Sequence, residues 1–243
     1  MDLKDKVAVV TGAGHRVGKC IALALAGAGV HVIVHYHQAA AEAAQTAAEI
    51  EALGVRAVAV GADLSEPTGA AVLFAAARDA FGGVDILINS AASMVGGNVL
   101  DLTPEAWQAV MDLNLSGPFY CSQQAARSML ERGGGAIVNI VDLSAVRPWA
   151  RYPAHSVSKA GLLMLTEVLA KALAPTIRVN ALALGPVIKP DDWTEARWQA
   201  VADHTLLKHP GSGYDVARAA LFVLQSDFMT GTTLTLDGGR LIA

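Results

Sequence analysis

The stretch Val7-Ala8-Val9-Val10-Thr11-Gly12-Ala13-Gly14-His15-Arg16-Val17-Gly18 decides the fold of this chain. An apolar run of strand length leads into a loop with three glycines, and an Ala/Leu-rich helical pattern follows from Lys19 to Ala28. A strand, a glycine turn and a helix N-terminus form a phosphate site, because the first-turn N–H groups have no internal partners and the helix dipole is positive there. Gly12 and Gly14 allow the turn and let the backbone approach a diphosphate, and Gly18 lets the helix pack closely on the strand. The stretch therefore predicts a dinucleotide-binding unit.

Strand-like and helix-like segments alternate along the rest of the chain. The predicted strands are Val7–Thr11, Val30–Tyr36, Ala57–Gly61, Asp85–Asn89, Ala136–Val141, Arg178–Leu184 and Thr233–Leu236. The predicted helices after the first are Ala39–Leu53, Gly69–Phe81, Pro104–Ser128, Ala154–Ala174 and Tyr214–Gln225. This alternation predicts an α/β fold, a doubly wound (Rossmann) parallel sheet of about seven strands with helices on both faces.

Length and composition limit the remaining possibilities. The chain has 243 residues, is 53% hydrophobic and carries a net charge of −4. We see no linker or repeat, and we predict one domain over residues 1–243. No signal-peptide core, membrane-length apolar run or basic block is present, so we expect a cytoplasmic protein without a membrane or nucleic-acid partner. The two cysteines, Cys20 and Cys121, lie inside apolar helical patterns and suit buried thiols better than a metal site or a disulfide framework.

A Pro/Trp-rich piece from Val187 to Trp198 interrupts the alternation. Long irregular segments in such folds are usually functional, so we interpret this one as a lid over the binding site. An irregular surface insertion is the alternative.

The end of the second strand selects the nicotinamide cofactor. An Asp or Glu there binds the ribose hydroxyls of NAD, and a cation favours the extra phosphate of NADP. This chain has His35-Tyr36-His37-Gln38, with no carboxylate to repel a phosphate, while Arg16 can reach back towards the same ribose and His15 and His37 can add donors. The pattern favours NADP(H). The alternative is that Arg16 is a solvated helix-start residue and the histidines pack at the strand end.

Two later strand ends also face the predicted crevice. Asp63, in Ala62-Asp63-Leu64, can bond an adenine amine or cap the next helix. Asn89 ends the fourth strand, and the small residues after it, including Ala91, let backbone lie against a ribose.

Candidates for the chemistry lie in the second half of the chain and just before it. Asn114 lies within a helical pattern, and Asp142 ends a buried strand. His155 and Lys159 are four residues apart and share one face of a long apolar helix. A cation beside a proton donor, both near a nicotinamide, is what reduction of a carbonyl or an imine needs.

Taken together, these residues resemble the short-chain dehydrogenase/reductase family over nearly the whole chain, from Thr11-Gly12 through Asn89, Asn114 and Lys159 to Asp237-Gly238-Gly239. Within it the chain is most similar to the pteridine reductases, including the bacterial dihydromonapterin reductases. Three features carry that closer likeness: Arg16 in place of the middle glycine, the segment His35-Tyr36-His37 followed by Ala40-Ala41-Glu42-Ala43, and Asp142 where most members have serine.

The chain also departs from these patterns. The family's catalytic tyrosine lies four residues before the lysine, and here that position is His155. Gln38 replaces a basic residue of the pteridine reductases, and Met94 lies where those enzymes offer an aromatic ring. The family's Pro-Gly after the sixth strand is shifted to Leu184-Gly185-Pro186.

The resemblance implies an NADP(H)-dependent reductase acting on a small molecule, with a dihydropteridine as a candidate, that assembles as a homotetramer through the helices containing Asn114 and Lys159. It implies that His155, or a water or Tyr152 in its place, supplies the proton, that Asp142 orients the donor, that Lys159 binds the nicotinamide ribose, and that Asn114 holds a water relay. The cofactor-binding set is then Gly12, Gly14, His15, Arg16, Val17, Tyr36, His37, Gln38, Asp63, Leu64, Asn89, Ala91, Lys159, Gly185 and Val187. Two alternatives stay open: a catalytically impaired nucleotide-binding protein or redox sensor, and an NAD-using dehydrogenase of a sugar or alcohol.

Overall fold

The computed structural model describes residues 1–243, which form seven strands and eight α-helices. The strands are β1 (Val7–Val10), β2 (His31–Tyr36), β3 (Ala57–Gly61), β4 (Ile86–Asn89), β5 (Gly135–Asp142), β6 (Ile177–Leu184) and β7 (Thr233–Leu236). The helices are α1 (Arg16–Gly27), α2 (Ala40–Glu51), α3 (Pro67–Phe81), α4 (Pro104–Met111), α5 (Gly117–Glu131), α6 (Pro153–Leu173), α7 (Glu195–Ala202) and α8 (Gly213–Gln225).

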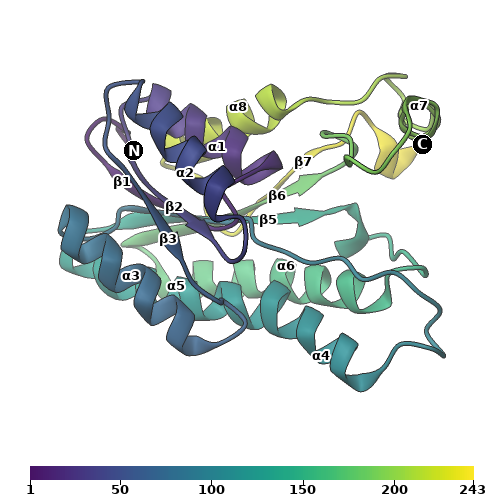
Figure 1. The fold of residues 1–243 in the computed structure, drawn as a ribbon, viewed down its shortest axis with the longest axis horizontal. Coiled ribbons are helices and arrows are strands. Elements are labelled where there is room, and N and C mark those ends of the chain that lie inside the picture. Colours follow the sequence, from purple (N-terminus) through teal and green to yellow (C-terminus); the bar gives the residue numbers. More distant parts are fainter.

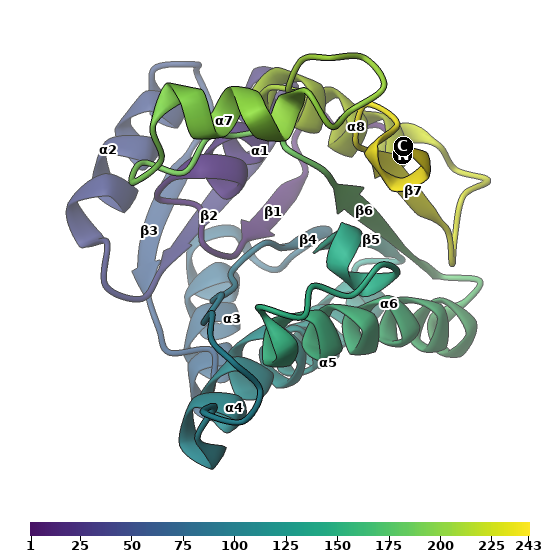
Figure 2. The ribbon, with the colours of Figure 1, turned by 90° about the vertical axis from the view of Figure 1, so that its right-hand side faces the viewer.

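All seven strands are parallel and lie in the order β3-β2-β1-β4-β5-β6-β7. Helices α1, α2 and α8 cover one face of the sheet, and α3, α5 and α6 cover the other (Figure 1). The chain reverses its direction of winding between β1 and β4, and ligands of such sheets bind beyond the carboxyl ends of the strands at this point. Figure 2 looks onto that end of the molecule.

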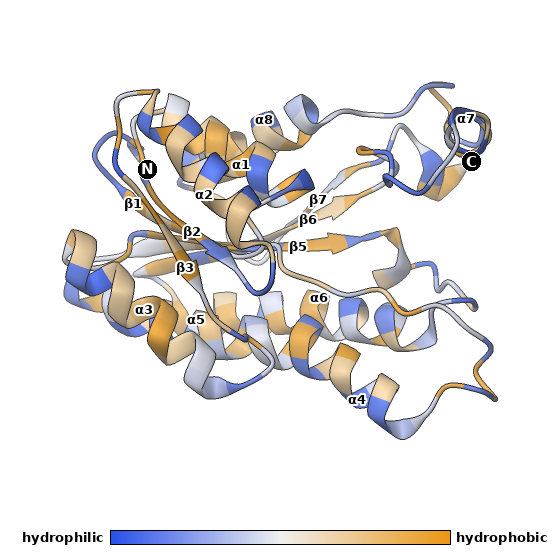
Figure 3. Ribbon diagram, viewed as in Figure 1, coloured by the Kyte–Doolittle hydropathy of each residue, from blue (hydrophilic) through white to orange (hydrophobic).

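Burial on both faces explains why the strands are almost continuously apolar. Ala8 and Val10 of β1 enter the core beneath α1 and α8, whereas Val9 between them enters the opposite core beneath α3 and α5. The strands are accordingly hydrophobic along most of their length (Figure 3). The predicted strand boundaries agree with the structure to within one residue at each end.

The long helix predicted over Pro104–Ser128 is wrong in one respect. It begins as expected, with Thr103 Oγ1 accepting from the backbone N–H of Ala106, but Asp112–Ser116 form a π-helical turn (η1) that separates α4 from α5. Such turns are frequent at functional sites. Helix α7, which overlaps the Val187–Trp198 segment, was not among the predicted helices.

The two thiols differ in burial. Cys121 of α5 is fully buried in the core beneath α3 and α5, as predicted, whereas Cys20 of α1 is only half-buried. None of the helices is both long enough and apolar enough to cross a bilayer.

Candidate active site

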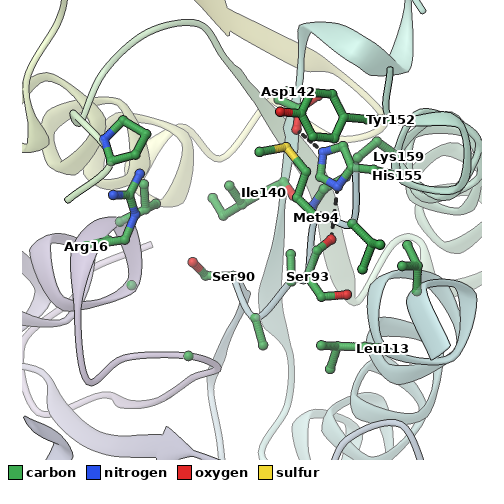
Figure 4. A pocket seen from close by; sticks show the side chains of 18 of the residues that line it. Arg16, Ser90, Ser93, Met94, Leu113, Ile140, Asp142, Tyr152, His155 and Lys159 are labelled. Carbon is green, nitrogen blue, oxygen red and sulfur yellow. Dashed lines mark hydrogen bonds and ion pairs between the residues drawn. The ribbon is translucent and has the colours of Figure 1, made fainter. Parts of the chain in front are cut away.

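A single large cavity of ≈1540 Å³ opens at the carboxyl ends of the strands. Its walls come from the loop before α1, the ends of β2 and β5, the loop after β4, the start of α6 and the segment after β6. Sites for drug-sized molecules usually measure roughly 300–1,000 Å³, so this one accommodates a longer ligand. Arg16 lies on one wall and the side chains of Asp142, His155 and Lys159 lie on the other (Figure 4).

The glycine loop is held in place by His35. The backbone N–H of Gly12 donates to His35 Nδ1 at 3.1 Å, and that of Ala13 donates to the backbone oxygen of His35 at 2.9 Å. Nδ1 is thus an acceptor, which leaves Nε2 to donate to the Ala62 backbone oxygen at 3.0 Å. Burial lowers the pKa of His35, in keeping with this neutral form.

The tight turn requires glycine at two positions. Gly12 has φ of +64°, and a Cβ on Gly18 would lie 2.3 Å from the backbone oxygen of Gly12. The first turn of α1, from Arg16 on, therefore starts directly at the cavity wall, with its unpaired N–H groups available to an anion. Since the N–H groups of Gly12 and Ala13 already donate to His35, the N–H groups from Gly14 onward can hold a diphosphate.

Arg16 does not point to the end of β2, as the cofactor prediction required. Its guanidinium donates to the backbone oxygens of Ile188 at 3.2 Å and Lys189 at 3.1 Å. These two consecutive carbonyls match the fork of the guanidinium, which explains the difference. Arg16 has φ of +52° and therefore occupies a backbone conformation that glycine adopts more readily.

Two other predicted cofactor residues are engaged elsewhere. Asp63 Oδ1 accepts from the backbone N–H and hydroxyl of Ser65 in the turn before α3, whose N-cap residue is Glu66, so Asp63 does not cap that helix as the alternative interpretation expected. Asn89 does not line the cavity; it is buried, and its amide donates to Asn139 and Ser122 within the core.

His155 lies at the centre of the opposite wall, on the first turns of α6. Its Nε2 is 2.7 Å from Asp142 Oδ2, and its Nδ1 is 3.1 Å from the backbone oxygen of Ser93 (Figure 4). The ring of Trp149 stacks on the imidazole with centroids 6.2 Å apart and an angle of 11°. Only 4% of His155 is exposed.

Asp142 ends β5 and receives several donors. Its Oδ1 accepts from the backbone N–H and the hydroxyl of Ser144 and so caps the short 3-10 turn Leu143–Ala145. Burial raises the pKa of Asp142, but the hydrogen bond with His155 and the positive charges of His155 and Lys159 outweigh this and hold the pKa below its usual value.

Lys159 is a buried cation one turn further along α6. Its Nζ donates to the backbone oxygen of Ile140 at 2.9 Å. Burial lowers the pKa of Lys159, and the negative charge of Asp142 opposes that effect. A buried ammonium beside a carboxylate and an imidazole is typical of catalytic sites.

Asn114 lies in η1, and its side chain makes no hydrogen bond to Lys159. Its Oδ1 accepts from the backbone N–H of Ser93, and its Nδ2 donates to the backbone oxygen of Ser93 and to Ser158 Oγ. Asn114 does not line the cavity. The water relay on this side chain stays a prediction; in this structure the Asn114 amide fixes the loop that carries the Ser93 carbonyl.

All the predicted site residues except Asn89 and Asn114 line the cavity, Arg16 and Asp63 included. These are Gly12, Gly14, His15, Arg16, Val17, Tyr36, His37, Gln38, Asp63, Leu64, Ala91, Asp142, His155, Lys159, Gly185 and Val187. The segment interpreted as a lid also contributes, through Ile188, Pro190 and Trp193.

Sequence analysis missed several residues of this site. Ser93 acts through its backbone oxygen, which leaves no signal in a sequence. Trp149 could have been found as an aromatic residue close to the predicted start of α6. Trp193, Arg197 and Trp198 also line the cavity, with the Arg197 guanidinium 3.7 Å above the ring of Trp193.

Comparison with known proteins gives a consistent result. Residues 6–199 match the family described as short chain dehydrogenase. The 3beta-hydroxysteroid dehydrogenase 1 of Eggerthella lenta is 36% identical over 246 residues, covering 98% of this chain and 94% of that protein.

Two solved structures share the fold and hold a cofactor. L-sorbose reductase from Gluconobacter frateurii, in complex with NADPH and L-sorbose, has a TM-score of 0.94 and 29% identity, with 100% of both chains covered. A short chain dehydrogenase from Burkholderia cenocepacia, in complex with NADP, has a TM-score of 0.91 and 34% identity, with 99% of both chains covered. The predicted doubly wound sheet is confirmed, and the predicted nicotinamide cofactor is confirmed at the level of these relatives.

Proposed function

Because the chain belongs to the short-chain dehydrogenase/reductase family, we propose that it is an NADP(H)-dependent reductase of a small molecule, acting on a carbonyl group or on a pteridine-like C=N bond. One observation carries this: a single cavity joins the N-terminus of α1 to the cluster of Asp142, His155 and Lys159. Residues 1–243 act as one domain in this proposal.

The residues present fit a phosphorylated dinucleotide. The amides of the first turn of α1 hold the diphosphate. Tyr36, His37 and Gln38 line the cavity where they would hold the adenosine ribose, and no carboxylate ends β2 to repel a 2′-phosphate. The NADPH and NADP of the two solved relatives support the same choice. When bound, the reduced nicotinamide supplies a hydride.

The second wall supplies the proton and the positive field. Lys159 binds the nicotinamide ribose, and its charge stabilises negative charge that develops on the substrate. The His155–Asp142 pair supplies the proton, in the place where most members of this family use a tyrosine. Asn114 acts indirectly, since it positions Ser93 and through it His155.

A flat substrate suits a cavity whose lining includes Met94, Trp149, Tyr152 and Trp193. A dihydropteridine has this shape and offers a C=N bond. Carbonyl compounds like the steroids and sugars in the names of the relatives are the other class.

We also propose that the protein is a homotetramer that pairs partly through α5 and α6. Val157, Met164 and Val168 recur at helical spacing on α6, and Phe119 lies on α5; all four are exposed apolar side chains. Light scattering measures the mass, and a monomer would exclude this arrangement.

Energy transfer from tryptophan to NADPH tests the cofactor, and a panel of L-sorbose, a 3-oxosteroid, a 3-oxoacyl thioester and dihydrobiopterin tests turnover. We expect NADPH to bind more tightly than NADH and one member of the panel to be reduced. Gln38→Asp places a carboxylate at the end of β2 and is expected to reverse the preference, because each 1.4 kcal/mol of repulsion weakens NADPH binding by about tenfold. Failure to bind either cofactor would exclude a reductase, and binding without turnover would favour a sensor.

A further inference from the structure

His155 has no nitrogen free for a substrate. Asn114 Nδ2 lies 3.4 Å from Nδ1 but already donates both of its hydrogens, to Ser93 O and Ser158 Oγ. The Nδ1 atom must therefore carry a hydrogen, which it donates to the Ser93 backbone oxygen. Nε2 faces Asp142 Oδ2 at 2.7 Å. Because both ring nitrogens have partners, a substrate would have to displace one of them to bond to the imidazole.

Asp142 is the more accessible member of the pair. Its side chain is 20% exposed against 5% for that of His155, and it lines the cavity. Both donors from Ser144 go to Oδ1, so His155 is the one protein partner of Oδ2. An Oδ2 with one bond retains a lone pair for a ligand in the cavity.

We propose that Asp142 Oδ2 is the atom that exchanges the proton with the substrate, and that His155 is a positioning residue that holds this proton and acts only through the carboxylate. The inference rests on the proposed reductase function. As the substrate carbon accepts a hydride from the reduced nicotinamide dinucleotide, its C=O or C=N π bond breaks. The Nε2–H bond of His155 breaks, and its proton passes to Asp142 Oδ2. The proton then passes from Oδ2 to the substrate oxygen or nitrogen. The pair is left as neutral imidazole and carboxylate, and regains one proton from water.

Other ionisable groups stand outside this exchange. Lys159 is the remaining charged group that acts on Asp142, and its Nζ is bonded to Ile140 O. Glu105, Asp112, Arg151 and Tyr152 line the same cavity, but none of them has a hydrogen bond or ion pair to Asp142 or His155.

The pair explains how a residue shorter than tyrosine can occupy the tyrosine position. A phenol is longer than an imidazole, so a tyrosine hydroxyl at position 155 would run onto the carboxylate that lies 2.7 Å beyond Nε2. Histidine with aspartate thus occupies the space that tyrosine with serine occupies in most members of the family. It follows that His155→Tyr should be tolerated only if Asp142 is shortened at the same time.

The test compares His155→Tyr, Asp142→Asn, Asp142→Ser and the double variant Asp142→Ser/His155→Tyr on the substrate found in the panel. Each single variant is expected to lose about 10²–10⁴-fold in kcat, the usual contribution of a positioned acid. The double variant is expected to regain about tenfold or more over either single, as coupled residues do. Melting temperature and NADPH binding show whether each variant is folded.

Nitrogen-15 NMR of the cofactor-free protein shows which ring nitrogens of His155 carry a proton. A purely structural role of Asp142 would leave that result unchanged. We expect a proton on both ring nitrogens of His155, and loss of the Nε2 proton in Asp142→Asn, because an amide donates where the carboxylate accepted. The pH profile of kcat should change its high-pH limb in the same variant.

The outcomes separate the two proposals. A wild-type protein that binds no cofactor, or reduces nothing, overturns the proposed function and this inference with it. An active wild type with an equally active Asp142→Asn, or with a His155→Tyr single variant as active as the double, overturns this inference alone.

Discussion

Gly18 shows how a single hydrogen atom in place of a methyl group can set the geometry of a binding site. A Cβ at this position would lie 2.3 Å from the oxygen of Gly12 and 3.1 Å from Cα of Ala13. Both neighbours are backbone atoms of the loop whose own amides are fixed by His35. They cannot rotate away as a side chain could, so the loop itself must move.

We expect Gly18→Ala to destabilise the protein by about 1–3 kcal/mol, the usual cost of overpacking, and to weaken NADPH binding because the anion-binding amides move with the loop. Gly27→Ala in the same helix is the matched control. Nothing lies within 4 Å of a Cβ there, so it should stabilise the helix by about 0.5–1 kcal/mol. Urea unfolding measures both, and equal effects would contradict the steric explanation.

The sequence predicts some contacts of the site residues and not others. It placed Asp142, His155 and Lys159 together, because strand ends and helix faces can be predicted from spacing. It could not foresee that His155 would be enclosed by Ser93 and Trp149, since a backbone carbonyl and a stacking geometry depend on loops. Arg16 was misplaced for the same reason, because its partners are carbonyls more than 170 residues away.

At the scale of elements, Arg16 connects the glycine loop to the segment between β6 and α7. Its guanidinium donates to the backbone oxygens of Ile188 and Lys189, and both Arg16 and Ile188 line the cavity. Lys189 also pairs with Glu195 in the first turn of α7, so the contact extends to that helix. Movement of this segment therefore requires release of Arg16.

Arg16→Gly removes this connection without backbone strain, because glycine tolerates φ of +52°. We expect hydrogen exchange over residues 186–194 to become about tenfold faster, equivalent to ~1.5 kcal/mol for one charge-assisted bond, with little change in global stability. Arg16→Lys keeps the charge but loses the two parallel donors of the guanidinium, so hydrogen exchange should accelerate nearly as much. Unchanged exchange in both variants would mean that the segment is held by its other contacts.

Regular elements were predictable and irregular ones were not. Strands buried on both faces give long apolar runs, and all seven were found from these. The π-helical turn at Asp112–Ser116 lies inside a pattern that continues through it, so periodicity does not reveal it. Helix α7 could not be predicted from periodicity, because Ala202 is its one buried residue and the helix has no apolar face.

At the scale of the whole molecule, the parallel sheet separates two cores that the site depends on equally. The first wall of the cavity rests on the core under α1 and α8, and the catalytic wall rests on α5 and α6 on the other face. A ligand that spans the cavity contacts both halves. Binding of the cofactor should therefore stabilise the entire fold, by roughly 2.7 kcal/mol at a concentration of 100 Kd.

The alkylation rate of Cys121 can measure this stabilisation. Full burial raises its pKa to about 12, so its sulfur can react with an alkylating reagent only when the molecule opens. In a Cys20→Ala background, mass spectrometry should record one slow modification whose rate falls about a hundredfold in saturating NADPH. Rapid labelling unaffected by the dinucleotide would reveal a local route to this sulfur. The modification rate of one native sulfur atom can thus report how strongly the bound dinucleotide holds the two halves of the molecule together, without any introduced dye.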